Sequence, residues 1–166
     1  KILGDLKHIS VNWDWLSGDI KYKRSSWKTS IPEGGGALSF YFSHGLHYME
    51  HFAGRIIHAR SLFTHSPSST NGGEVGVNIL LQFKNGVTGY AHVSCISTGM
   101  VKHQLIFQCE HGMIVLENKN AVVNKFTVKV YSQEGIKQLR VVKDKNLKGK
   151  DERVKIVRKL ASRFIN

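Results

Sequence analysis

Three histidines at helical spacing, His44, His47 and His51, are the residues of this sequence best suited to chemistry. An imidazole changes its charge near neutral pH, so it can act as a general acid or base or bind a substrate hydroxyl. The same side chains could instead bind zinc. A zinc site needs three or four converging ligands, however, and the sequence places no cysteine near these histidines. We therefore expect proton transfer or substrate binding here rather than a metal site.

The histidines lie in residues 34–54, GGGALSFYFSHGLHYMEHFAG, which we interpret as a helix. Phe40 precedes His44 by four residues and extends the histidine stripe. An apolar stripe on roughly the opposite side consists of Leu38, Phe42, Gly45, Met49 and Phe52. Because a helix that is apolar on both sides is usually buried on both sides, we expect one stripe to pack on a sheet and the imidazoles to face an enclosed space.

The glycine run, Gly34, Gly35 and Gly36, is expected at the entry of this helix, because glycine in a helix interior costs backbone entropy. Free amides there could hold a phosphate group. Alternatively, the missing side chains could let the backbone approach a neighbouring domain or a cofactor closely. We expect Trp27, just upstream, to line the same cleft.

Alternating apolar residues predict strands on both sides of the helix. The predicted strands cover residues 2–15, 55–63, 75–83, 87–95, 105–109, 113–117, 126–131 and 136–142. They are followed by a lysine-rich loop at residues 143–150 and an amphipathic helix at residues 154–164. With about six or seven mostly antiparallel strands after the first helix, this order predicts an α+β fold with helices on one face of an open sheet.

The strongest local signal is a hairpin around Lys84, Asn85 and Gly86. A three-residue loop pairs Phe83 with Val87 and keeps the apolar residues of both strands on one face, whereas a two-residue loop does not. We therefore predict the three-residue loop, with Gly86 in the left-handed conformation.

Composition indicates one domain, residues 1–166, because 166 residues with 41% hydrophobic content can form a core. The net charge of +12 is concentrated in residues 125–166, which hold 13 Lys or Arg against 4 acidic residues. No segment approaches the roughly 20 apolar residues that span a bilayer, so no membrane partner is expected. Cys95 and Cys109 have neither metal spacing nor a disulfide framework, which indicates buried free thiols in a reducing cytoplasm.

The glycine run, with a histidine eight residues after its last glycine, resembles the C-terminal domain of the glucose-fructose oxidoreductase, inositol dehydrogenase and MocA family. The hairpin at residues 83–86 and the turn at residues 110–113 extend the resemblance over nearly the whole chain. It implies an NAD- or NADP-dependent oxidoreductase acting on a sugar, cyclitol or nucleotide-sugar. An N-terminal dinucleotide-binding domain, not present in this chain, would bind the cofactor and supply a lysine. The open sheet would form a homodimer or homotetramer.

The family pattern GGGxLxDxGxHxxD assigns roles residue by residue. His44 matches the catalytic histidine, Phe40 stands at the position of the first aspartate, and His47 at that of the last. The resemblance therefore implies that His44 is the acid or base and that His47 binds substrate. Tyr41 and Tyr48 flank the stripe and could donate hydrogen bonds to a sugar, with core packing as the alternative role.

The resemblance also favours close backbone approach as the role of the glycines, with Gly35 and Gly36 beside the cofactor. Two other functions stay open. Phe40 in place of the aspartate favours a non-catalytic dimerisation module of the same fold. The basic residues 125–166 suit a nucleic-acid-binding domain, although they lack the interleaved aromatic residues that stack on bases.

Overall fold

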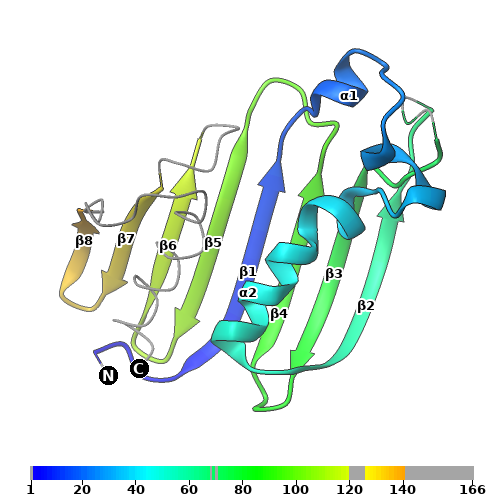
Figure 1. The fold of residues 1–166 in the computed structure, drawn as a ribbon. Coiled ribbons are helices and arrows are strands. Elements are labelled where there is room, and N and C mark those ends of the chain that lie inside the picture. The colour runs from blue at the N-terminus through cyan, green and yellow to red at the C-terminus, as the bar shows by residue number, and fades with distance from the viewer. Residues whose placement is uncertain (1, 68, 70, 120–125, 141–166) are drawn as a thin grey trace, which may run out of the picture.

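The computed structural model describes residues 2–67, 69, 71–119 and 126–140, which form an eight-stranded sheet crossed by one helical segment (Figure 1). The strands are β1 Leu6–Asp14, β2 Ile56–Thr64, β3 Gly76–Phe83, β4 Thr88–Ser94, β5 Lys102–Cys109, β6 Gly112–Asn118, β7 Thr127–Ser132 and β8 Gly135–Leu139. The helical elements are α1 Gly18–Lys21, the 3₁₀ turns η1 Trp27–Thr29 and η2 Ile31–Glu33, the π-helical segment η3 Ala37–Phe42, and α2 Ser43–Ala53.

The strand order in the sheet is β2-β3-β4-β1-β5-β6-β7-β8, so the first strand of the chain lies near its centre. β1 pairs parallel with β4 and antiparallel with β5, and the other pairs are antiparallel. The predicted α+β fold with an open, mostly antiparallel sheet is confirmed, with seven strands after the helix, where six or seven were expected. The predicted loop at residues 143–150 and helix at residues 154–164 lie outside the described residues.

The hairpin of β3 and β4 has the predicted register. Leu81 pairs with Gly89, and the amide of Phe83 donates to the carbonyl of Val87 at 2.9 Å. Gly86 has a φ of 85°, the left-handed conformation that the three-residue loop requires. The side chain of Asn85 accepts a hydrogen bond from the amide of Val87 at 3.3 Å and supports the turn.

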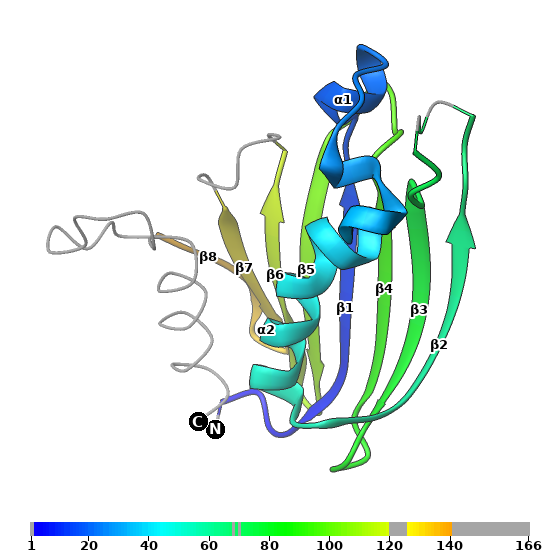
Figure 2. The ribbon, with the colours of Figure 1, turned by 45° about the vertical axis from the view of Figure 1, so that its right-hand side comes forward.

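One face of the sheet, the covered face, packs against α2 across the central strands (Figure 2). Phe42 and Met49 of the apolar stripe are fully buried, as is Ile9 of β1. Phe52 of α2 stacks edge-to-face on Phe107 of β5, with ring centroids 5.2 Å apart. These contacts fix the orientation of α2 relative to the sheet, because buried apolar side chains stabilise only one packing of the helix.

A row of aromatic rings continues the covered face toward β7. Trp13 stacks on Trp15 and, nearly parallel at 8°, on His103, with both centroid distances 4.5 Å. On one side Tyr41 lies beside Trp15 and also contacts Phe40, and on the other side Phe126 lies beside His103. Neither ring nitrogen of His103 has a hydrogen-bond partner, and burial lowers the pKa of this imidazole to about 4. His103 is therefore a neutral core residue.

The opposite face of the sheet, the open face, carries no helix in the described part of the chain. A polar network crosses its centre. His92 contacts Asp14 Oδ1 through Nε2 at 3.1 Å and Asn78 Oδ1 through Nδ1 at 2.8 Å. The hydroxyl of Tyr90 donates to the same Asn78 oxygen at 2.9 Å, and that of Ser97 donates to Asp14 at 3.0 Å. The network joins side chains of β1, β3 and β4.

Both cysteines are free thiols, but the prediction that both are buried is right for Cys95 and wrong for Cys109. Cys95 is buried, which raises its pKa to about 11, whereas Cys109 is half-buried and its pKa is raised mainly by burial. Within the described ranges, no helix combines the length and apolar character needed to cross a membrane.

Candidate active site

The predicted helix at residues 34–54 is present, but its first part is wound differently from its second. Ala37–Phe42 is π-helical, α2 follows at Ser43, and Gly54 ends the helix with a φ of 86°. Glu74 satisfies the first amides, since its backbone carbonyl accepts from Ala37 and its carboxylate accepts from Leu38 at 3.0 Å. The helix therefore begins against the loop that precedes β3.

The glycine run brings a second segment against the start of the helix. The amide of Gly35 donates to the carbonyl of Ser30, and that of Gly36 donates to the carbonyl of Lys28, both at 2.9 Å. A Cβ on Gly35 would overlap the carbonyl oxygen of Trp27. Both glycines are buried, and their missing side chains are what allow η1 to lie directly on the helix entry.

The histidine face, which comprises His44, His47 and His51 of α2, is exposed along its length. The expectation that these imidazoles face an enclosed space is wrong for the described chain, because α2 buries other residues, Met49 and Ala53 among them, and leaves the imidazoles exposed. This arrangement of exposed imidazoles on a fixed helix suits proton transfer or substrate binding. The buried side holds the helix rigidly, while each imidazole can reach a group outside this chain.

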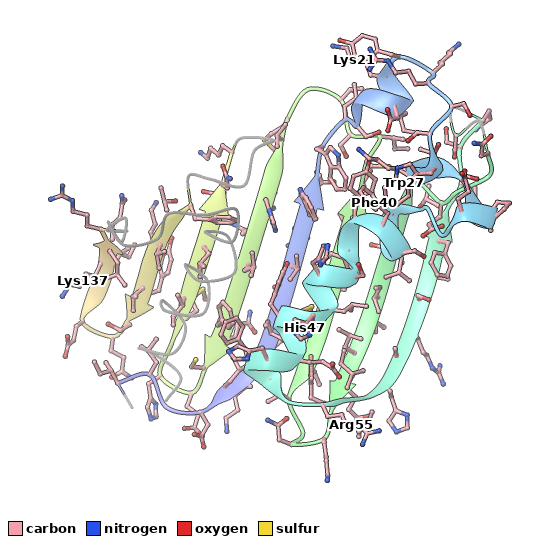
Figure 3. All side chains as sticks on the ribbon, viewed as in Figure 1. Lys21, Trp27, Phe40, His47, Arg55 and Lys137 are labelled. Carbon is pink, nitrogen blue, oxygen red and sulfur yellow. The ribbon has the colours of Figure 1, made fainter. Side chains whose placement is uncertain are left out.

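An aromatic corner, comprising Trp27, Lys28 and Phe40, adjoins the amino-terminal end of the histidine face (Figure 3). Trp27 is 50% exposed and meets Phe40 edge-to-face, with ring centroids 4.6 Å apart. The Lys28 ammonium lies 5.4 Å from the centroid of the Phe40 ring. Phe40 is about one helical turn before His44, so the corner and the imidazole share one side of the helix.

The amino-acid sequence matches the family model described as GFO/IDH/MocA C-terminal domain over residues 1–115. The chain belongs to this family. The matched residues include the glycine run, the aromatic corner and the whole histidine face. No curated protein sequence matches the chain.

Solved structures share the fold of this GFO/IDH/MocA domain. Aldose-aldose oxidoreductase from Caulobacter crescentus, complexed with glycerol, superposes with a TM-score of 0.70 at 13% identity, covering 97% of this chain and 46% of that one. An NAD binding oxidoreductase from Klebsiella pneumoniae gives 0.64 at 19% identity, covering 83% and 40%. The WlbA dehydrogenase from Bordetella pertussis, in complex with NADH and UDP-GlcNAcA, gives 0.63 at 17% identity, covering 75% and 38%. The domain spans less than half the length of each of these proteins.

The two tyrosines predicted to bind substrate lie deeper in the GFO/IDH/MocA domain than the histidines. The hydroxyl of Tyr48 is buried without a hydrogen-bond partner, and burial raises its pKa. Tyr41 is half-buried against Trp15 and Phe40, and its pKa is raised mainly by burial. Both side chains pack against the core, which was the alternative role.

Sequence reasoning missed Lys28, which completes the aromatic corner of this domain. The signal was available, because Lys28 is adjacent to Trp27 and precedes a glycine run whose missing side chains indicate a close approach of two backbones. Within residues 2–67, 69, 71–119 and 126–140, no three His, Cys, Asp or Glu side chains converge as metal ligands.

Proposed function

We propose that this domain forms the substrate side of an NAD- or NADP-dependent oxidoreductase that acts on a sugar, cyclitol or nucleotide-sugar. The observation that carries the proposal is His44, an exposed imidazole on a helix whose opposite side is locked into the core. Membership of the GFO/IDH/MocA C-terminal domain family supports an oxidoreductase. The dinucleotide-binding domain and the cytoplasmic location are part of the same proposal.

Oxidation of a secondary alcohol removes a hydride from carbon and a proton from oxygen. The nicotinamide, when bound, accepts the hydride. His44 takes the proton from the alcohol oxygen as general base and returns it as general acid in the reverse direction. A lysine of the dinucleotide-binding domain assists. His47, exposed nearly one turn further along α2, binds a second hydroxyl of the substrate.

The remaining predicted contacts differ in what they can offer. Trp27 presents half of its side chain to a ligand, whereas Tyr41 and Tyr48 support the site by packing behind it. The amides of Gly35 and Gly36 are occupied by carbonyls of this chain. In this proposal the two glycines therefore lie near the cofactor through close backbone packing, and the phosphates are bound by the other domain.

The open face pairs with a second copy of the chain in a homodimer or homotetramer. Two exposed leucines, Leu62 and Leu80, lie on this face beside the polar network of His92. Exposed apolar side chains beside hydrogen-bonded polar groups occur together in protein interfaces.

The test is the turnover of the complete enzyme with NAD(P) and a panel of sugars. His44→Ala should lower kcat at least about a hundredfold, the scale of a lost general acid or base. His51→Ala is the matched control, because His51 is exposed on the same face two turns away and should leave kcat near normal. Near-normal turnover of His44→Ala would contradict the proposal.

A non-catalytic dimerisation module is the second candidate function. Phe40 favours it, because an aromatic ring one turn before His44 cannot orient the imidazole or share its proton as a carboxylate would. A complete protein that associates but binds neither NADH nor NADPH, measured by fluorescence, would support this module instead of the enzyme.

A further inference from the structure

Lys28 is a cation that no carboxylate of the described residues pairs with. It is half-buried, its backbone carbonyl is fixed by the amide of Gly36, and its ammonium lies over the ring of Phe40. Among the described residues no carboxylate forms an ion pair with it, in contrast to Lys7, whose ammonium lies 2.7 Å from Glu110. An ammonium that no carboxylate of the described residues pairs with is open to an ion pair, so this position favours an anion supplied by a ligand.

The two rings beside Lys28 provide a surface for the rest of that ligand. Trp27 and Phe40 meet at 77°, Trp27 is 50% exposed, and the Lys28 ammonium lies against the same Phe40 ring. Aromatic rings of this kind provide rigid apolar contact area, and the C–H face of a sugar ring is the part of a sugar that packs on it. The corner therefore offers one positive charge and one flat apolar surface about a helical turn from His44.

We propose that Trp27, Lys28 and Phe40 form a subsite for the negatively charged group of the substrate, which is an acidic sugar carrying a carboxylate or a phosphate. The sugar ring packs on Trp27, the anionic group pairs with Lys28, and the carbon to be oxidised lies toward His44. This inference rests on the proposed function for the reaction, but the binding preference belongs to the subsite alone.

The test measures binding of three probes to the complete enzyme: glucuronate, glucose 6-phosphate and glucose. Tryptophan fluorescence reports on Trp27, with Trp27→Phe subtracting the signal of the buried Trp15 and of Trp13. At least one charged probe should bind about tenfold or more tightly than glucose, because an ion pair with hydrogen bonds is lost with the neutral sugar. Tighter binding of glucuronate would indicate a carboxylate substrate, and tighter binding of glucose 6-phosphate would indicate a phosphate substrate.

Lys28→Met should weaken binding of the preferred charged probe about tenfold and leave glucose unchanged, whereas Lys28→Arg should retain the preference. Lys21→Met is the matched control, because the Lys21 ammonium lies 5.1 Å from the ring centroid of Tyr22, on α1 and away from the histidine face. This variant should bind all three probes as the parent does.

Phe40→Asp tests the same subsite by changing the partner of Lys28 instead of Lys28 itself. An aspartate there would give Lys28 an internal carboxylate partner, so the preference for charged probes should fall to that of Lys28→Met. The proposal is overturned if glucose binds as tightly as both charged probes, if neither charged probe binds, or if Lys28→Met changes nothing. Charge-selective binding without turnover by the enzyme would instead contradict the proposed function and leave the subsite standing.

Discussion

The covered face and the open face of the sheet each hold one histidine on strands next to β1, in opposite surroundings. On the covered face, His103 is 6% exposed and stacks on Trp13 with neither ring nitrogen bonded. On the open face, both ring nitrogens of His92 contact oxygen atoms, of Asp14 and Asn78. The covered face thus excludes polar partners and stabilises the fold, whereas the open face keeps polar groups paired at a surface that another molecule can cover.

The comparison is tested most strongly by Phe107 and Ile106, neighbours on β5 that point to opposite faces. Phe107→Ala on the covered face should lower the free energy of unfolding by about 3–5 kcal/mol, because Phe107 is 1% exposed and packs under Phe52. Ile106→Ala on the open face should cost about 1 kcal/mol, since that side chain is half-exposed. Urea denaturation measures both values, and equal costs would show that the open face is packed like the covered one.

His103 predicts how the stability of the covered face depends on pH. Its folded-state pKa of about 4 lies below the value of 6.5 for a free histidine, so the unfolded chain binds the proton first. The full stability is therefore present above about pH 6.5 and is lost as the pH falls toward 4, by about 3 kcal/mol in total.

The measurement is the free energy of unfolding at pH 7 and at pH 4.5, for the parent and for His103→Phe. The phenylalanine keeps the stacking on Trp13 but cannot take up a proton. The free energy of unfolding of the variant should therefore fall less between pH 7 and pH 4.5 than that of the parent, because the contribution of His103 is removed. An unchanged difference would mean that His103 finds a partner for its proton in the folded state.

Leu80 probes the open face, with the smallest effect on the fold itself. It is 62% exposed, so Leu80→Glu should change the free energy of unfolding by less than about 0.5 kcal/mol. A carboxylate in the proposed interface should nevertheless raise the Kd of self-association at least about tenfold in sedimentation equilibrium. Met100→Glu, a similarly exposed position between β4 and β5, is the control and should not change the Kd. A monomeric parent at micromolar concentration would remove the interface altogether.

The parts of the fold that the sequence predicts are those fixed by neighbouring residues. The sequence predicts the β3–β4 hairpin and also its strand register, because the turn at Gly86 and the alternating apolar residues around it lie within about twenty residues. The parallel pairing of β1 with β4 does not follow, since it joins residues about eighty positions apart. Such a pairing depends on which strands bury the most apolar surface together, and the local pattern carries no information on that.

The candidate site divides in the same way. Helical spacing alone places His44 and His47 on one side of α2, opposite the apolar stripe. It does not show that these imidazoles are exposed, because burial depends on which other segments cover the helix. Nor does spacing reveal Lys28, whose position is set by the contact of Gly35 and Gly36 with a segment outside the helix.

The π-helical winding of Ala37–Phe42 makes the site sensitive to insertions and deletions. A π-helix holds one residue more in each hydrogen-bonded turn than an α-helix. Deleting one residue there would restore α-helical winding and rotate the preceding segment by about 100° relative to α2. The buried side of α2 would keep the helix and its histidine face in place, while the aromatic corner would turn away from that face. Changing the length of this one turn would therefore reshape the proposed site without replacing any of the residues that form it.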